Sequence, residues 1–325
     1  MKAIVQERYG SADVLEFRDI EEPTAGENDV LVRVRAAGCG PDVWHIMAGE
    51  PYIARLALGL RAPKIAVRGW DVAGTVEAVG ANVQDLRPGD EVMGTAEQGS
   101  FAELTVTPAD RVVLKPAGIS FEQAAAVPVS GVTALRAVRD EAQVKPGKDV
   151  LVIGAAGGVG SFAVQIAKAF RANVTGVCST GKADLVRSIG ADDVIDYTRE
   201  DFTDGSRRWD AIIDTAGRRP LSQLRRALTE KGTLVIVGGD GGGRWTGGFF
   251  RGVLRAPVVS LFVGQRLRGL ATKLEDRQNL NDLTQLMESG AVKPVIDRTY
   301  PLIEAPDAIR YLAEGHPAGK VVITV

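Results

Sequence analysis

The feature that most constrains the fold of this chain is an apolar run that leads directly into a cluster of glycines. Val150–Ile153 is uninterrupted and apolar, Gly154–Gly160 follows it, and Phe162, Ile166 and Phe170 then share one helical face. This order is typical of a buried strand, a tight turn and an amphipathic helix. Glycines leave backbone N–H groups at a helix N-terminus open to a ligand, and the partial positive charge there favours a diphosphate. The segment therefore predicts a dinucleotide-binding loop. The alternative is a tight strand-to-helix turn without a ligand. The residues of the loop are Gly154, Ala155, Ala156, Gly157, Gly158, Val159 and Gly160.

The chain that follows this loop alternates between strands and helices. Short apolar runs recur between helical stretches of about ten to fifteen residues, a pattern that predicts a parallel sheet with helices on both faces. In such a doubly wound α/β sheet, Gly160 allows the first helix to pack closely against its strand. The expected strands are Val150–Gly154, Asn173–Val177, Asp193–Tyr197, Ala211–Asp214 and Thr233–Val237, with Pro257–Val263 as the sixth.

The first 120 residues have a different pattern, in which short β-branched runs are separated by glycine and proline turns such as Arg87–Asp90. This pattern predicts a mostly antiparallel, barrel-like β domain. Its expected strands are Lys2–Gln6, Val30–Ala36, Asp71–Val79, Asp90–Gly94 and Phe101–Val106.

The last part of the chain is expected to return to this β domain and to make it discontinuous. A polar helix at Lys273–Ser289 is followed by two strand-like runs, Ile296–Tyr300 and Lys320–Val325, around a helix at Ala305–Glu314. Near residue 120, Ser120 and Gln123 have the spacing of a capping box, which marks a helix start. The predicted domains are therefore 1–122 with 267–325 for the β domain, and 123–266 for the nucleotide-binding domain.

The composition narrows the functional classes. With 39 basic and 41 acidic residues, the chain lacks the basic excess that nucleic-acid binding usually needs. The start lacks the apolar core of a signal peptide, and no apolar run reaches the roughly 18 residues of a membrane helix. Two cysteines, Cys39 and Cys178, imply no disulfide framework and favour a reduced, cytoplasmic setting.

The same counts argue against a metal. Cys39 and His45 superficially resemble the first half of a catalytic zinc site, but the remaining cysteine and histidine, Cys178 and His316, lie far along the chain. Because a catalytic zinc needs three protein ligands, we expect no metal site. Without a Lewis acid, reduction of an electron-poor acceptor is feasible by positioning alone.

The end of the second expected strand bears on the choice of cofactor. A site selective for NAD places a carboxylate there to hold the ribose hydroxyls, whereas this chain has Ser179 and Lys182. A hydroxyl donor and an ammonium suit the additional phosphate of NADPH, and Tyr197 can add a phenolic donor. These residues favour NADPH as the cofactor; the alternative is a capped helix start with a solvated lysine.

In combination, these motifs resemble the medium-chain dehydrogenase/reductase superfamily, and specifically its zinc-free quinone oxidoreductase branch. The resemblance covers essentially the whole chain and is carried by Met1–Ala3, Gly69–Val76, Arg87–Val92, Gly99–Glu103, Ala124–Pro128, the glycine loop and Gly319–Val322. Where zinc-containing relatives have a His–Glu pair, this chain has Trp70 and Asp71. Where related quinone reductases commonly have Val-Asn-Pro, it has Cys39, Gly40 and Pro41.

The resemblance implies a GroES-like β-barrel domain, a six-stranded Rossmann domain and a homodimer. It also implies that Thr133 lies beside the nicotinamide and that His316 and Lys320 approach the cofactor phosphates. Further cofactor contacts implied in this way are Val159, Ser179, Lys182, Tyr197, Gly238, Leu261, Phe262 and Val263.

The expected reaction is transfer of a hydride from NADPH to a small-molecule acceptor, a quinone or an α,β-unsaturated carbonyl. Aromatic side chains suit a flat acceptor, and the candidates that line its site are Trp44, His45, Tyr52, Trp70 and Thr133. For both tryptophans, plain packing is the alternative, and for His45 a surface or structural role. Asp42, His45 or solvent can supply the proton.

Two other functions fit the same sequence. One is reduction of an enoyl thioester by an enzyme of the same superfamily, and the other is a non-enzymatic NADPH-binding sensor or scaffold. The glycine-rich stretch Gly238–Arg255 is expected to be a mobile flap, with a peripheral membrane contact or a solvated loop as alternatives.

Overall fold

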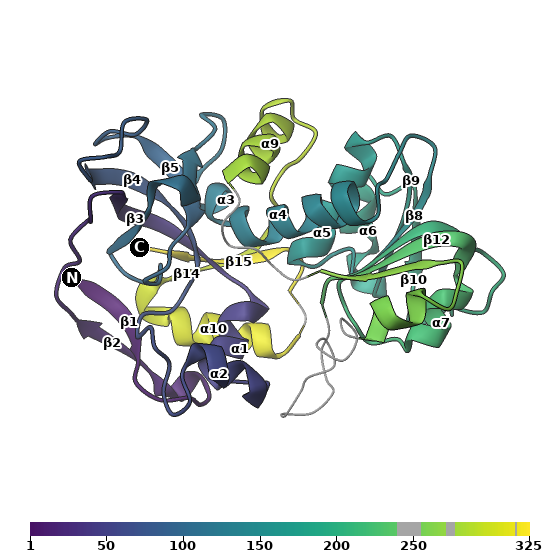
Figure 1. Cartoon of the computed structure of the whole chain (residues 1–325), viewed down its shortest axis with the longest axis horizontal. Coiled ribbons are helices and arrows are strands. Elements are labelled where there is room, and N and C mark those ends of the chain that lie inside the picture. The colour runs from purple at the N-terminus through teal and green to yellow at the C-terminus, as the bar shows by residue number, and fades with distance from the viewer. Residues whose placement is uncertain (239–254, 271–276, 316) are drawn as a thin grey trace. The chain divides into compact units, whose positions relative to one another are not determined.

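The computed structural model describes residues 1–238, 255–270, 277–315 and 317–325, which form two compact units (Figure 1). Unit 1 comprises Met1–Val132, Lys273–Glu288 and Pro294–Val325, and unit 2 comprises Thr133–Thr272 and Ser289–Lys293. The boundary thus falls between Val132 and Thr133, about ten residues beyond the expected one, because the helix at Phe121–Ala125 packs on strands of unit 1.

Unit 1 is built around a seven-stranded sheet in the order β14-β15-β3-β4-β5-β7, with β6 also pairing with β3, beside a two-stranded sheet of β1 and β2. β15 pairs antiparallel with β3, so the end of the chain is part of the N-terminal sheet and the expected discontinuous β domain is confirmed. The strands are β1 (Lys2–Gln6), β2 (Leu15–Asp19), β3 (Asp29–Cys39), β4 (Asp71–Val79), β5 (Glu91–Thr95), β6 (Leu104–Pro108), β7 (Val112–Leu114), β14 (Ile296–Pro301) and β15 (Lys320–Thr324).

Helices connect and cover these strands. The capping box at α3 is confirmed, because the Ser120 hydroxyl accepts from Gln123 N and Ser120 N donates to the Gln123 side chain. The helices are α1 (Pro41–Ala48), α2 (Arg55–Leu58), α3 (Phe121–Ala125), α4 (Pro128–Leu135), α9 (Arg277–Glu288) and α10 (Ala305–Ala313), with short 3-10 turns at Ala12–Val14, Tyr52–Ala54, Ala109–Arg111 and Leu302–Glu304. Helix α1 was not predicted: it begins with Pro41 after Gly40, which provides no side-chain cap.

Unit 2 contains a six-stranded sheet in the order β10-β9-β8-β11-β12-β13, in which every neighbouring pair is parallel. Because crossovers between parallel strands are right-handed, α5 and α6 cover one face and α7 the other (Figure 1). The elements are the π-helix Arg136–Glu141, β8 (Asp149–Ile153), α5 (Gly158–Ala169), β9 (Asn173–Cys178), the 3-10 helix Thr180–Lys182, α6 (Ala183–Ser188), β10 (Asp193–Asp196), β11 (Trp209–Asp214), α7 (Leu221–Arg226), β12 (Leu228–Ile236) and β13 (Arg266–Gly269). The predicted doubly wound α/β fold is confirmed.

The sixth strand is not where the sequence predicted it. Pro257–Val263 was expected to be this strand, but residues 255–260 are helical and Leu261 and Phe262 lie in a turn, 81% and 82% exposed. The strand is β13, whose central Leu267 is buried while Arg266 and Arg268 face outward. Since an edge strand needs to bury only one face, β13 lacks the apolar run that marks the inner strands.

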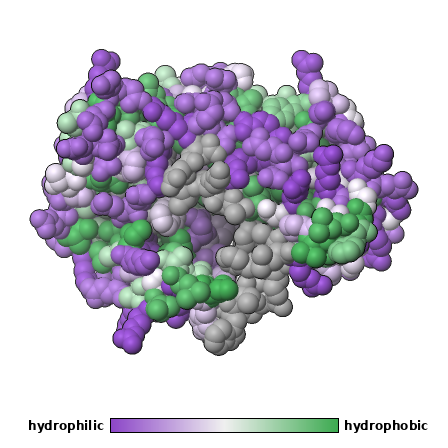
Figure 2. Space-filling view, viewed as in Figure 1, coloured by the Kyte–Doolittle hydropathy of each residue, from purple (hydrophilic) through white to green (hydrophobic). Residues whose placement is uncertain are grey.

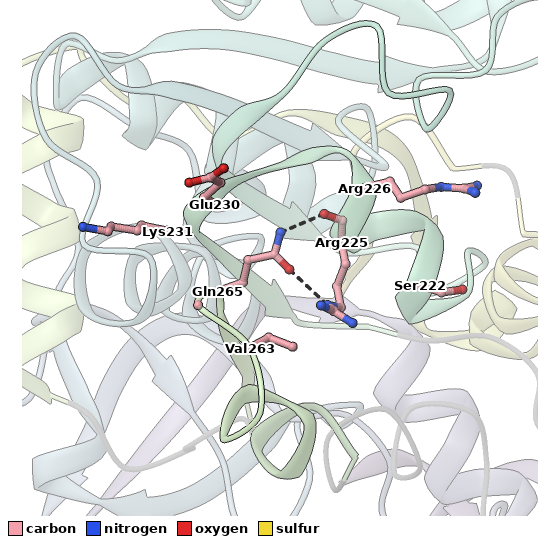
Figure 3. Close-up of a pocket in the computed structure, with 8 residues that line it drawn as sticks. Ser222, Arg225, Arg226, Glu230, Lys231, Val263 and Gln265 are labelled. Atoms are coloured by element: carbon pink, nitrogen blue, oxygen red, sulfur yellow. Dashed lines mark hydrogen bonds between the residues drawn. The ribbon is translucent and has the colours of Figure 1, made fainter.

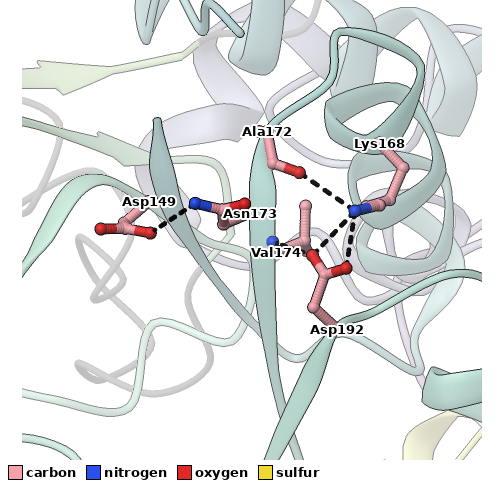
Figure 4. Close-up of polar contacts among 6 residues, drawn as sticks. All are labelled: Asp149, Lys168, Ala172, Asn173, Val174 and Asp192. Carbon is pink, nitrogen blue, oxygen red and sulfur yellow. Dashed lines mark hydrogen bonds and ion pairs between the residues drawn. The ribbon is translucent and has the colours of Figure 1, made fainter. Parts of the chain in front are cut away.

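Polar side chains connect the amino ends of β8, β9 and β10 (Figure 4). The Asn173 amide donates to Asp149 at 3.1 Å. Lys168 Nζ bonds Asp192 at 2.7 Å, and Asp192 in turn accepts from Val174 N. These contacts stabilise the amino ends of the strands, whereas the glycine loop lies at the carboxyl end of β8.

The surface in Figure 2 is mostly hydrophilic, with separate apolar patches. The exposed large apolar side chains include Ile53, Leu56 and Leu60 in unit 1 and Val258, Leu261 and Phe262 in unit 2. None of the helices in the described part of the chain has the length and apolar character needed to cross a bilayer.

Candidate active site

The glycine loop at the end of β8 turns sharply into α5. Gly154 has a positive φ of 78°, which favours glycine. A Cβ on Gly160 would lie 2.1 Å from the Gly154 carbonyl oxygen, so only glycine allows this approach of helix to strand. Gly157 precedes α5 without a side-chain cap. Backbone N–H groups in the first turn of a helix have no carbonyl partner within that helix, so those of α5 are suited to an anion.

A buried carboxylate that the sequence analysis missed lies beside this loop, at the end of β11. Asp214 is 2% exposed, and its Oδ1 accepts from Ala216 N and Gly217 N at 3.1 and 2.9 Å. Burial raises the pKa of Asp214 from 3.8 to about 6, although the two backbone N–H groups oppose the shift. The only sequence signal is its place at the end of an apolar strand.

Replacing Asp214 with asparagine is expected to stabilise the protein above pH 6. A carboxyl whose pKa rises from 3.8 to about 6 on folding holds a proton in the folded state that the unfolded chain releases. The wild type therefore loses stability as the pH rises through this window, by up to about 3 kcal/mol. Asparagine keeps the oxygen that accepts both N–H bonds but carries no charge.

Urea unfolding of the wild type and Asp214→Asn at pH 4 and pH 8 measures this effect. The stability difference in favour of the variant should be larger at pH 8. An equal difference at both pH values would show that Asp214 has an ordinary pKa.

The end of β9 carries the residues expected to distinguish the cofactors. Ser179 and Lys182 are partly exposed, at the start and end of the 3-10 turn that follows the strand. Asp196, which pairs with Cys178 across the sheet, was missed: its carboxylate accepts from the hydroxyls of Thr180 and Thr198. These hydrogen bonds lower the pKa of Asp196. Because Asp196 contacts Thr180, a carboxylate lies at the turn that follows Ser179, and it comes from the third strand of unit 2 rather than the second.

Four other predicted cofactor residues come from several parts of the chain. Tyr197 is 47% exposed just beyond β10. Gly238 follows β12, where a Cβ would be 2.3 Å from the Thr215 carbonyl oxygen. Thr133 is buried in α4. His316, together with most of Gly238–Arg255, lies outside the described residues.

In unit 1, α1 and the turn after it hold three of the predicted acceptor residues. The rings of Trp44 and His45 meet edge to face with centroids 4.9 Å apart, and His45 Nδ1 contacts the Glu50 carbonyl at 3.1 Å. The Tyr52 ring is covered by the Arg55 guanidinium, 4.5 Å from its centroid. Trp44 and Trp70 pack on the core of unit 1 and remain partly exposed, so both have a packing role and a face left open.

Lys320, predicted to contact the cofactor phosphates, is instead buried in an ion pair. Its Nζ lies 2.9 Å from Asp71 Oδ2, and both side chains are 4% exposed. Asp71 Oδ1 accepts from Val129 N at 2.8 Å. Burial would lower the pKa of Lys320, but the charges of Asp71 and Asp42 outweigh it and raise that pKa. The charge of Lys320 is thus already balanced by a carboxylate, and its contact with the cofactor phosphates stays a prediction.

Gly40 brings two further groups close to this ion pair. A Cβ on Gly40 would lie 2.3 Å from Asp42 Oδ1 and 3.6 Å from Lys320 Nζ. Burial raises the pKa of Asp42, and the Asp71 charge adds to the effect while Lys320 opposes it. Burial likewise raises the pKa of the Cys39 thiol. In the described part of the chain, no three His, Cys, Asp or Glu side chains are grouped as metal ligands.

A groove of about 530 Å³ lies at the β13 edge of unit 2 (Figure 3). Gln265 spans it, accepting from Arg225 Nε at 3.0 Å and donating to the Arg225 carbonyl at 2.8 Å. Arg226 and Lys231 add positive charge and Glu230 negative charge. Of the predicted cofactor residues that the structure describes, Val263 alone lines it, so this groove is separate from the glycine loop.

Family models match both units. Residues 26–117 match the alcohol dehydrogenase GroES-like domain, and residues 189–323 match the family described as zinc-binding dehydrogenase.

Individual relatives align over nearly the whole chain. A 2-methylene-furan-3-one reductase from Solanum lycopersicum is 35% identical over 99% of this chain and 79% of its own length. A chloroplast envelope quinone oxidoreductase homolog from Arabidopsis thaliana is 31% identical over 99% of this chain and 98% of its own. The solved quinone oxidoreductase of Coxiella burnetii superimposes with a TM-score of 0.86 at 31% identity, covering 100% of this chain and 99% of that one. The chain therefore belongs to the medium-chain dehydrogenase/reductase superfamily and is an oxidoreductase of the branch that contains the quinone oxidoreductases.

Proposed function

We propose that this oxidoreductase reduces small, electron-poor acceptors, quinones or α,β-unsaturated carbonyls, with NADPH and without a metal. The observation that carries the proposal is the N-terminus of α5, which no side chain caps and which the glycine loop Gly154–Gly160 forms. A side chain on Gly160 would collide with the Gly154 carbonyl oxygen. The names of the relatives, which include quinone oxidoreductases and an alkenal/one oxidoreductase, support the acceptor class.

The residues of unit 2 would hold the cofactor along the carboxyl ends of its strands. The N–H groups at the start of α5 suit the diphosphate. Ser179 and Lys182 suit the phosphate on the adenosine ribose, and Tyr197, Gly238 and Thr133 complete the proposed contacts. When bound, the nicotinamide supplies the hydride. We do not include Leu261 and Phe262 among the proposed contacts, because they were assigned as part of a strand. Residues 255–260 form a helix instead, and Leu261 and Phe262 lie in an exposed turn.

The residues of unit 1 would bind and orient the acceptor. Trp44, His45, Tyr52 and Trp70 provide aromatic surface on which a planar acceptor can stack. Asp71, at the position of the zinc-associated glutamate of relatives, is neutralised by Lys320. The Lys320 ammonium thus already balances the negative charge of Asp71, so this carboxylate needs no metal ion to balance it. This supports a reaction without a metal.

Steady-state oxidation of NADPH and NADH with a quinone, an enone and an enoyl thioester tests this function. We expect turnover of the quinone or the enone, with NADPH preferred. Turnover of the thioester alone would identify an enoyl-thioester reductase, and tight NADPH binding without any turnover would identify a sensor. About one equivalent of zinc in the active protein would overturn the metal-free proposal.

We further propose that the protein is a cytoplasmic homodimer. It binds no nucleic acid, and no helix in the described part of the chain spans a membrane. Both cysteines are buried and unpaired, which suits a reducing compartment. Val258, Leu261 and Phe262 leave apolar surface near the edge strand β13, and an unpaired edge is a natural place for a second copy to pair.

A further inference from the structure

A cavity within unit 1 has a buried arginine in its wall. The cavity has a volume of about 240 Å³ and is bounded by α1, α2 and the segment that leads into β4. Its lining is mostly apolar and includes Ile46, Leu58, Ile65 and Trp70. Arg68, which lies among them, is only 3% exposed. A cationic side chain in such surroundings normally has an anionic partner.

Arg68 has no anionic partner among the described residues. Its Nη2 donates to the Ile65 carbonyl, and its buried Nε has no hydrogen-bond partner. The carboxylate in the cavity lining, Glu97, pairs with Arg111 at 2.6 Å instead. Burial lowers the pKa of Arg68 to about 10, so the guanidinium is still charged at neutral pH. The cavity wall therefore includes a positive charge that no carboxylate of the described residues balances.

A neighbouring hydroxyl also has no hydrogen-bond partner among the residues that the structure describes. Ser100 Oγ is buried without a hydrogen-bond partner, and Ser100 N donates to the Arg68 carbonyl at 3.0 Å. A Cβ on Gly69, which lines the cavity, would be 2.4 Å from this hydroxyl. Buried polar groups in native proteins are nearly always hydrogen-bonded. Of these two residues only Arg68 lines the cavity, and its guanidinium is the group there that lacks a charged partner.

We propose that this cavity binds a small organic monocarboxylate, with the carboxylate on Arg68 and the apolar body against Ile46 and Leu58. Guanidinium and carboxylate have matching planar geometry and form charge-assisted hydrogen bonds. A lining that is mostly apolar suits a ligand with one charged end and an apolar body better than a phosphate or sulfate, which carries polar oxygens on every side. Lys64, exposed in the lining, adds attraction for an anion.

Binding of octanoate and of octanamide to the full-length chain without cofactor tests this proposal. The two probes share an apolar tail, and only octanoate carries the charge. We expect calorimetry to show at least ten-fold tighter binding of octanoate, since charge-assisted hydrogen bonds exceed neutral ones. Because Trp70 also belongs to the proposed acceptor surface, binding is measured without turnover. Failure of the reductase proposal would leave this result unchanged.

Arg68→Met should abolish the preference for octanoate. It should also raise the midpoint of thermal unfolding without ligand, because an unpaired buried charge is removed. Lys64→Met, which removes an exposed charge of the same lining, should retain the ten-fold preference. Leu58→Trp should weaken both probes by filling the cavity, and it tests the site even if Arg68→Met does not fold.

Three outcomes would overturn the proposal. The first is that the wild type binds the two probes equally, or binds neither. The second is that Arg68→Met keeps the preference for octanoate. The third is that Leu58→Trp binds octanoate as tightly as the wild type does.

Discussion

Replacing Lys320 with methionine is expected to lower the free energy of unfolding by about 3–5 kcal/mol, the usual cost of removing one partner of a buried ion pair. The change leaves Asp71 with a carboxylate that has lost its 2.9 Å contact. Because both side chains are 4% exposed, water cannot take the place of the ammonium. Urea unfolding at pH 7 measures the loss.

A second substitution in the same background separates charge from packing. Asp71→Asn combined with Lys320→Met removes the orphaned charge, and the amide oxygen can still accept from Val129 N. This double variant should recover most of the lost stability. The matched control is Arg33→Met, which breaks the exposed Arg33–Glu77 pair, with side chains 50% and 43% exposed.

An exposed pair contributes at most about 1 kcal/mol, so Arg33→Met should cost far less than Lys320→Met. Equal losses in the two single variants would mean that the Asp71–Lys320 pair is not buried in solution.

Replacing Lys182 with alanine is expected to raise the KM for NADPH by about ten-fold to one hundred-fold and to leave the KM for NADH nearly unchanged. A hydrogen bond to a charged group contributes about 1.5–3 kcal/mol, and each 1.4 kcal/mol corresponds to about ten-fold in affinity. Only NADPH carries the phosphate that Lys182 is proposed to bind. Initial rates at varied concentrations of each cofactor, with a quinone acceptor, measure the effect.

Lys148→Ala is the matched control for this experiment. Lys148 lies just before β8, at the opposite ends of the same strands, where its Nζ is 3.3 Å from Asp210. Its loss removes one positive charge from unit 2 without touching the proposed phosphate site. If both variants raise the two KM values to the same extent, Lys182 has no specific role in cofactor selection.

The sequence predicted the parts of the fold that depend on local pattern. Strands β1 and β4 have the predicted bounds, Lys2–Gln6 and Asp71–Val79, because their runs end at clear turns. The loop before α5 was found because glycine is required there by a positive φ at Gly154 and by the close approach at Gly160. Local signals of this kind do not depend on the rest of the chain.

Features that depend on distant segments were missed or misplaced. Asp71 and Lys320 are 249 positions apart, and nothing local to either residue indicates an ion pair. Asp196 reaches the end of the second strand of the fold only because β10 lies beside β9. The apolar run at Pro257–Val263 suggested a strand, yet part of it lies on the surface, so hydrophobicity alone gave the wrong element. Helix α1 was missed because its N-cap residue, Gly40, has no side chain that marks a helix start in the sequence.

The position of β15 between β14 and β3 has a consequence for the order in which the chain folds during synthesis. The parallel sheet of unit 2 is complete once Gly269 has been made, whereas the sheet of unit 1 still lacks β15, one of the neighbours of β3, until Thr324 emerges. Domains generally fold as units during translation. Unit 2 can thus fold before unit 1 does, although the first strands of unit 1 are made earlier. The sheet of unit 1 is completed only when β15 has been made.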